Sequence, residues 1–236
     1  MTPVVVCGPH GSASTWAFNI AREMVIDQHG AAHVLSGVIQ AAPGPLPEPV
    51  TGCVYKTHGW PDLPAWAEHN GAKLLLTVRD PRDCVLSVMR RAWPTVEQAG
   101  EPIEAWARLY PALLAHPGCK LVVYEDAPFD RVDQVVGIAL WLGAPSTLAR
   151  CLHLRQTYGT AGMRAFAAGI AASDHPADLL GIRHDPATDY QAGHIGTADL
   201  YGWYKQPPAV RAELTAWMID RILPHVGEAF PYSRTP

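Results

Sequence analysis

Four short apolar runs, rich in β-branched residues or leucine, recur along the first half of the chain. They are residues 3–7, 52–58, 73–78 and 119–124, and a shorter run at 33–35 is a possible fifth strand. The run at 3–7 has no polar alternation, which is typical of a strand buried on both faces of a parallel sheet. The pattern therefore predicts a buried sheet that begins close to the first residue.

Apolar residues recur at helical spacing between and after these runs. The expected helices are 17–30, one starting near Pro61, 81–89, one around 103–114 bounded by Pro94 and Pro117, 132–143, pieces of 150–182, and 207–230. Strands and helices alternate, which favours an α/β fold with a central parallel sheet. A length of 236 residues is that of one α/β domain, so 1–236 is expected to form a single domain.

The turn at 8–16 follows the first strand and is rich in small and hydroxyl-bearing residues. Backbone N–H groups of such a turn converge on a phosphate, and the following helix adds its partial positive charge. The turn lacks the Gly-Lys-Ser/Thr ending of a Walker A motif. The alternative interpretation is a tight strand-to-helix connection that is capped by Ser12 or Ser14 and binds nothing.

Lys56 and His58 stand at the carboxyl end of the run at 52–58, where open parallel sheets bind ligands. They are two residues apart, so an extended backbone projects both to one side. A lysine for anionic charge beside a histidine suits the transfer of an anionic group onto a hydroxyl. Alternatively, Lys56 is a surface lysine and His58 caps the helix near Pro61.

Arg79 ends the strand at 73–78 and lies at the same edge. Asp80 and Pro81 fit the N-cap and the first position of the next helix. Ser87 lies two turns into that helix, within reach of an anion at Arg79 if the helix faces the crevice. In the alternative, Arg79 pairs with Asp80 or Asp83 and Ser87 only packs.

Two segments are read as loops. Residues 43–49 carry alternating prolines, which keep them out of a sheet interior, and form either a spacer or a lid. Residues 183–205 are expected to fold over a site. Within them, His184 with Asp185 and Asp189 is read as a loop with local hydrogen bonds and not as a metal site.

Composition narrows the function classes. A net charge of −4 argues against a nucleic-acid binder. Five cysteines without a CxxC pair favour free thiols over disulfides or a metal site. No apolar run approaches the ~20 residues of a membrane span, and the first strand leaves no room for a signal peptide. A cytoplasmic protein with no membrane partner is expected.

Four motifs in fixed order resemble the sulfotransferases that use 3′-phosphoadenosine 5′-phosphosulfate (PAPS). They are Gly-Ser-Ala-Ser-Thr-Trp at 11–16, Lys-Thr-His at 56–58, Arg-Asp-Pro-Arg-Asp with a later Ser at 79–87, and Tyr-Glu-Asp at 124–126 before a helix ending Leu-Gly at 142–143. The Arg-to-Ser motif is the most specific. The matched region is about 3–143. A weaker match to bacterial members lies at 190–204, with His194-Ile195-Gly196 and Gly202-Trp203.

The resemblance implies a three-layer α/β/α, P-loop-NTPase-like fold, with PAPS as co-substrate and no metal. His58 would be the general base, and Lys56 would steady charge on the transferring sulfuryl group. The acceptor would be a hydroxyl or amine of a small molecule or saccharide. The implied cofactor-binding residues are the turn residues Gly11, Ser12, Ala13, Ser14, Thr15 and Trp16 for the phosphosulfate, Arg79 and Ser87 for the 3′-phosphate, and Tyr124 and His194.

Two departures from the family pattern stand out. Gly11 occupies the place where most members carry a lysine or arginine, and the adjacent His10 is expected to supply a positive donor when protonated. The family also carries an Arg-Lys-Gly element later in the chain, and here Gln191-Ala192-Gly193 is only a poor match to it. The alternatives are therefore a non-catalytic, sulfotransferase-like nucleotide-binding protein, or a P-loop kinase, which the missing Walker A ending disfavours.

Overall fold

The computed structural model describes residues 2–44, 50–91, 93–174, 183–191, 200–227 and 230–232. Its central sheet has five strands in the order β2-β3-β1-β4-β5, and all neighbouring strands are parallel. The strands are β1 (Val4–Cys7), β2 (Val34–Val38), β3 (Gly52–Thr57), β4 (Lys73–Val78) and β5 (Cys119–Val123). The predicted parallel sheet is confirmed.

Helices follow the strands along the chain. They are α1 (Ser14–His29), α2 (Leu63–His69), α3 (Pro81–Met89), α4 (Val96–Ala115), α5 (Val132–Leu142), α6 (Leu148–Tyr158), α7 (Thr160–Ala171), α8 (Pro208–Arg221) and α9 (Leu223–Val226). Short 3₁₀ turns include η2 (Tyr124–Asp126) and η4 (Gly202–Lys205), and β6 (His184–Asp185) pairs antiparallel with β7 (Tyr190–Gln191).

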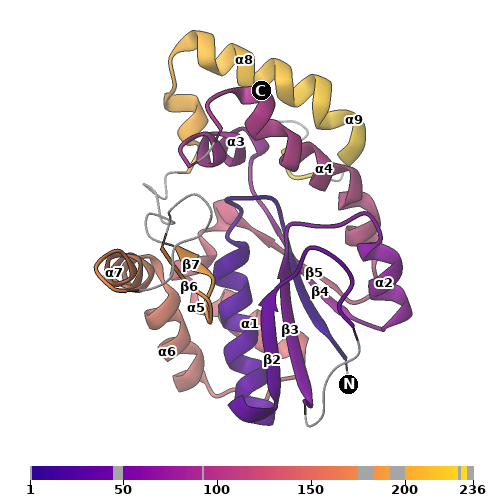
Figure 1. Ribbon diagram of the computed structural model, residues 1–236, viewed down its shortest axis with the longest axis vertical. Helices are drawn as coiled ribbons and strands as arrows, with labels where there is room; N and C mark the ends of the chain where they lie inside the picture. The colour runs from indigo at the N-terminus through magenta and orange to yellow at the C-terminus, as the bar shows by residue number, and fades with distance from the viewer. Residues whose placement is uncertain are drawn as a thin grey trace.

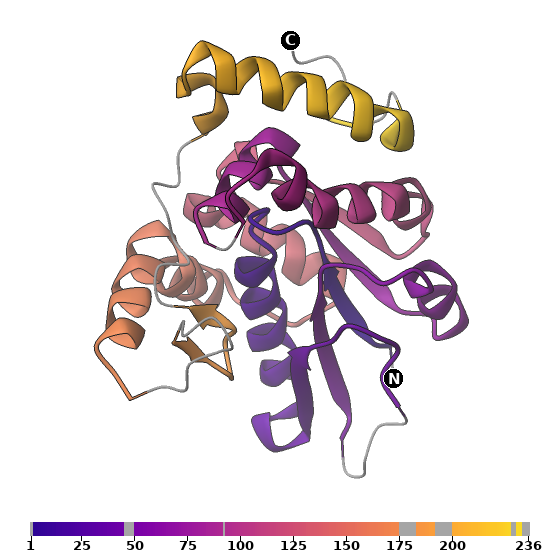
Figure 2. The ribbon, with the colours of Figure 1, turned by 45° about the horizontal axis from the view of Figure 1, so that its top comes forward.

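The helices cover the sheet on both faces and give three layers (Figures 1 and 2). Successive side chains of β1 point to opposite faces. Val4 and Val6 join the core under α1, α5, α6 and α7, whereas Val5 and Cys7 join the core under α2, α3, α4 and α8. Both cores are built from fully buried aliphatic and aromatic side chains. The three-layer α/β/α architecture is therefore confirmed.

α4 lies between Pro94 and Pro117, as expected, and it begins at Val96 because Thr95 caps it by accepting a hydrogen bond from the Gln98 N–H. Pro102 and Pro111 are accommodated within this helix. The expected helix at 207–230 is α8 followed by the single-turn α9, with a break at Ile222.

The carboxyl ends of β1, β3, β4 and β5 meet at the edge of the sheet beneath α3 and α8 (Figure 1). This edge carries the motifs singled out above. Most of the proline-rich segment, 45–49, and residues 192–199 of the expected covering loop lie outside the described residues. In the described ranges no helix is long and apolar enough to cross a membrane.

Candidate functional site

The turn between β1 and α1 packs so closely against β4 that position 8 requires glycine. A Cβ on Gly8 would lie 2.0 Å from Thr77 Oγ1 and 2.6 Å from the Thr77 carbonyl oxygen, so the backbone of β4 presses directly on the turn. Ser12 is fully buried and its hydroxyl bonds the Pro9 carbonyl oxygen at 2.7 Å and Thr77 Oγ1 at 2.7 Å. Ser12 therefore fixes the turn to the sheet.

Two residues of the turn adopt left-handed backbone conformations. Gly11 has φ 81°, and Ala13, the N-cap of α1, has φ 74° and ψ 15°. A non-glycine residue in this region is strained, and such residues cluster at ligand-binding sites. Within the described chain no side chain caps α1, and its first turn contains no acidic residue. The N-terminus of a helix of this kind is a usual place for anions to bind in proteins, so anion binding at this 16-residue helix stays a prediction.

Arg79 connects this turn to the ends of β4 and β5. Its Nη1 donates to the Gly11 carbonyl oxygen at 3.1 Å, and its Nη2 lies 3.5 Å from Asp83 Oδ2. The guanidinium stacks over the Tyr124 ring at 4.0 Å. Arg79 thus pairs with Asp83, as the alternative interpretation held, and it also lies at the predicted edge.

Ser87 reaches the same turn from α3. A Cβ on Gly11 would lie 2.9 Å from both Cβ and Oγ of Ser87, so the two residues touch and only glycine fits. This contact explains why a lysine is absent at position 11: any side chain there would displace α3. Arg79 and Ser87 therefore both contact Gly11. Their binding of one anion stays a prediction.

The two histidines of the site stack on each other. The rings of His10 and His58 have centroids 3.6 Å apart and planes inclined by 27°. His58 Nδ1 lies 2.9 Å from the Gly8 carbonyl oxygen, which can only accept, so Nδ1 carries the proton and Nε2 holds the lone pair. His58 therefore contacts the turn and does not cap α2.

Both imidazoles are held in the neutral form. Burial lowers the pKa of His10 to about 3, with contributions from Arg91 and Lys56. Burial also lowers the pKa of His58 well below 6.5, and His10 and Lys56 add to the shift. His10 was expected to supply a positive charge. The structure contradicts this expectation, because desolvation and two nearby cations disfavour the protonation of His10.

Lys56 forms an ion pair with Asp189, a residue that the sequence interpretation did not assign to the site. Its Nζ lies 2.5 Å from Asp189 Oδ2, and its side chain is 4% exposed. Burial lowers the pKa of Lys56 and Asp189 opposes this shift. Asp189 has φ 57° in the turn between β6 and β7. No local sequence signal marks it, because its partner lies 133 positions away.

The hairpin that carries Asp189 is anchored on α1. Asn19 Nδ2 donates to the Thr188 carbonyl oxygen at 2.8 Å, and Arg22 donates to the Ala187 carbonyl oxygen. Asp185 accepts from the Ala187 N–H and the Thr188 hydroxyl, as predicted for a loop with local hydrogen bonds. This part of residues 183–205 therefore folds over the site.

A second segment from late in the chain, around Trp203, packs against the start of α3. The Trp203 N–H donates to Asp83 Oδ1 at 2.7 Å, and Arg82 stacks on the Trp203 ring at 3.5 Å. Asp80 is the predicted N-cap and forms a buried ion pair with Arg82 at 2.8 Å. The weaker sequence match at 202–203 thus contacts the most specific motif.

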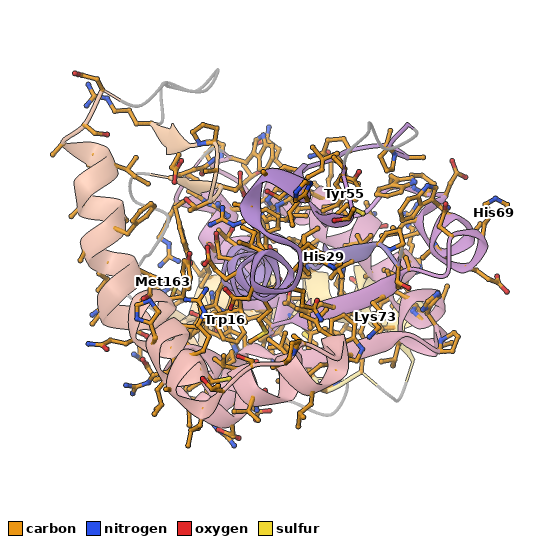
Figure 3. The ribbon with its side chains drawn as sticks, turned by 90° about the horizontal axis from the view of Figure 1, so that it is seen from below. Trp16, His29, Tyr55, His69, Lys73 and Met163 are labelled. Atoms are coloured by element: carbon orange, nitrogen blue, oxygen red, sulfur yellow. The ribbon has the colours of Figure 1, made fainter. Side chains whose placement is uncertain are left out.

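Other predicted residues fall in different surroundings. Trp16 is 1% exposed and packs edge-on against Phe129, in the core between α1 and the helices α5 and α6 (Figure 3). Its contact with a nucleotide stays a prediction. Ser14 and Thr15 are buried at the start of α1. His194 lies outside the described residues.

Arg91 is a further cation of this site that the sequence interpretation missed. It follows Ser87 by one helical turn, and this spacing is the signal that could have found it. Its charge acts on His10, Lys56 and His58 and lowers the pKa of each. No group of three or more metal-binding side chains occurs in the ranges that the structure covers.

Comparison with known proteins supports the fold assignment. No protein-family model and no curated protein matches the sequence. A mouse sulfotransferase complexed with PAP (adenosine 3′,5′-bisphosphate) has a TM-score of 0.62 and 12% identity, with 93% of this chain and 83% of that chain covered. A retinol dehydratase with androsterone and PAP gives 0.61 and 13%, covering 93% and 80%. A retinol dehydratase with retinol and PAP gives 0.62 and 12%, covering 94% and 82%. The chain therefore has the sulfotransferase fold.

Proposed function

We propose that the protein is a PAPS-dependent sulfotransferase whose single domain spans 1–236. The observation that carries the proposal is the convergence on one turn of Arg79, Ser87 and His58, which come from three different strand ends or helices. The fold is that of a solved sulfotransferase and a solved retinol dehydratase, both of which hold PAP. A phosphate suits this turn because it precedes the N-terminus of the 16-residue helix α1, whose first turn carries no acidic residue.

The donor would lie along the edge of the sheet. The N–H groups at the start of α1, with Ser14 and Thr15, would bind the 5′-phosphosulfate. Arg79 and Ser87 would bind the 3′-phosphate, which distinguishes this donor from ATP. Tyr124 would hold the Arg79 guanidinium in place through the stacking contact at 4.0 Å.

His58 is suited to act as the base. Its Nε2 lone pair is directed away from the Gly8 carbonyl oxygen and accepts the proton of the acceptor hydroxyl or amine. PAPS supplies a sulfuryl group whose bond to the 5′-phosphate oxygen breaks, leaving the electron pair on that oxygen as the acceptor oxygen or nitrogen bonds to sulfur. Positioning and charge stabilisation, not covalent catalysis, are what the chain contributes.

The acceptor would be a small molecule or a saccharide with a hydroxyl or amine. Retinol and androsterone are bound by proteins of similar fold. Next to His58, the aromatic pair Trp60 and Trp66 packs edge-to-face with centroids 6.0 Å apart, and Trp66 is half-buried. Trp60 belongs to the core and Trp66 packs against that core, so only the half-buried Trp66 offers ring surface to an apolar or sugar acceptor.

Calorimetric titration with PAP tests the proposal, with magnesium-ATP as the comparison ligand. We expect PAP to bind and ATP to bind at least ten-fold more weakly, because ATP lacks a 3′-phosphate. Arg79→Ala should lose about 1.5–3 kcal/mol of PAP binding, a charge-assisted contact, or roughly 10- to 100-fold in Kd. The control is Arg131→Ala, which removes an exposed arginine paired only with Asp133 among the described residues. Preference for ATP would reopen the P-loop kinase interpretation.

A non-catalytic nucleotide-binding protein is the second candidate, and the neutralisation of Lys56 by Asp189 is the observation that favours it. His58→Ala separates the two. In an enzyme, conversion of PAPS to PAP should fall about 10²- to 10⁴-fold while the Kd for PAP changes little. Unchanged conversion would remove His58 from the chemistry.

A further inference from the structure

The groups around the turn leave an anion poorly compensated. Lys56 is paired with Asp189 at 2.5 Å, and Arg79 lies 3.5 Å from Asp83. The two histidines are neutral near pH 7 because burial lowers their pKa values. The contact with Ser87 excludes a side chain at Gly11. A phosphosulfate in the turn therefore needs a cation from elsewhere in the fold.

Arg91 is placed to supply that cation. Its backbone N–H donates to the Val88 carbonyl oxygen at 2.9 Å, which continues the helical path of α3 by one turn. Arg91 thus lies on the same face as Ser87, and Ser87 touches Gly11 of the turn. Arg91 Nε donates to the Ser87 carbonyl oxygen at 3.2 Å, so the half-buried side chain folds back along α3 toward the turn.

The electrostatic surroundings agree with this geometry. Arg91 lowers the pKa values of His10, Lys56 and His58, and Asp189 acts in turn on Arg91. One cation is therefore within interaction range of both histidines and of the Lys56–Asp189 pair. In the described part of the chain the Arg91 side chain makes one hydrogen bond, through Nε. Its Nη1 and Nη2 donors are left to bind a ligand.

We propose that Arg91 binds the sulfuryl oxygens of the donor and replaces the cation that the turn lacks. This inference rests on the proposed function. A guanidinium presents a planar fork of donors that matches a tetrahedral oxyanion and remains charged when half-buried. Because PAP has no sulfuryl group, Arg91 would discriminate the donor from the product. Arg79 and Ser87, which bind the 3′-phosphate common to both, would not.

Paired titrations with PAP and PAPS, at a temperature and time at which PAPS stays intact, test this role. Arg91→Ala should weaken PAPS binding about 10- to 100-fold and PAP binding less than about 3-fold. Arg90→Ala is the matched control, since Arg90 is the exposed neighbour on the same helix end, and it should change neither Kd. Arg91→Lys should restore part of the PAPS affinity. Arg91→Gln keeps length without charge and serves if the alanine variant does not fold.

The outcomes separate the two proposals. Equal weakening of PAP and PAPS, or no weakening of either, would overturn the role of Arg91 while wild-type binding of PAP still supports the proposed function. Failure of the wild-type protein to bind either nucleotide would overturn the proposed function itself. Selective loss of PAPS binding in Arg91→Ala and Arg91→Gln, absent in Arg90→Ala, supports the assignment.

Discussion

His10 and His58 stack with ring centroids 3.6 Å apart, and burial holds both imidazoles neutral. Two histidines in contact cannot both become protonated without strong repulsion. The pair therefore keeps the Nε2 lone pair of His58 available at pH values where an exposed histidine would be charged. Stacking on His10 and the hydrogen bond from Nδ1 to the Gly8 carbonyl oxygen together fix the orientation of the His58 ring.

The first prediction concerns stability at low pH. Unfolded histidine titrates near 6.5, whereas folded His10 titrates at about 3, so between these values the unfolded state binds one more proton. This histidine should therefore lower the free energy of unfolding by up to about 1.4 kcal/mol per pH unit as the pH falls from 6 to 4. His10→Phe keeps an aromatic ring and should flatten the slope. Urea denaturation at several pH values measures it, and an identical slope in both proteins contradicts the prediction.

The second prediction concerns the ion pair of Lys56 and Asp189. Asp189→Asn leaves a buried, unpaired ammonium and should cost about 3 kcal/mol in the free energy of unfolding. PAP brings negative charge to the same edge, so saturating PAP should raise the melting temperature more in the variant than in the wild type. Asp174→Asn, an exposed aspartate at the end of α7, is the control. An equal shift in both proteins would place the bound anion away from Lys56.

The third prediction concerns the close approach of β4 to the turn. Gly8→Ala places a Cβ against Thr77 Oγ1 and the Thr77 carbonyl oxygen, so we expect a loss of at least 1–3 kcal/mol of stability. PAP binding should be lost with the turn geometry. Gly37→Ala in β2 is the control, because a Cβ there meets nothing within 4 Å. Comparable stability of the two variants would contradict the tight packing.

The fourth prediction concerns the ring beneath Arg79. Tyr124→Phe keeps the cation–π contact at 4.0 Å and should leave the Kd for PAP within about 3-fold. Tyr124→Leu removes it and should weaken PAP binding by about 0.5–2 kcal/mol, or roughly 2- to 30-fold. Calorimetry on both variants gives the comparison. If Phe and Leu behaved alike, the hydroxyl or simple bulk would be the relevant property.

Much of the fold could be predicted because its strands are self-contained signals. The run at 73–78 is β4 residue for residue, and Asp80 and Pro81 mark the start of α3 as capping rules require. The bounds of α4 were predicted too, because Pro94 and Pro117 flank the helix and Thr95 caps it by accepting from the Gln98 N–H.

The place of a candidate site residue was predictable where it follows a strand end, and also for Ser87 in the helix after Arg79. Lys56, His58 and Arg79 lie at carboxyl ends of parallel strands, so topology alone brings them together. Asp189 and Arg91 do not: one reaches the site from a hairpin turn, the other by folding back along a helix. The contact of Asp189 depends on tertiary packing, which spacing in the sequence does not encode, whereas the spacing of Arg91 from Ser87 was a signal that the interpretation did not use.

The docking of the hairpin turn at 185–190 on α1 has a kinetic consequence. The five strands of the central sheet all lie before residue 124 in the sequence, whereas Asp189, the partner of Lys56, lies 66 positions after Val123. Contacts between distant segments form late, because the intervening chain must first lose its freedom. We expect the sheet and the turn to fold first, while the charge of Lys56 is still unpaired. The edge that carries Lys56 would reach its final structure in a separate, slower phase, when the hairpin packs on α1.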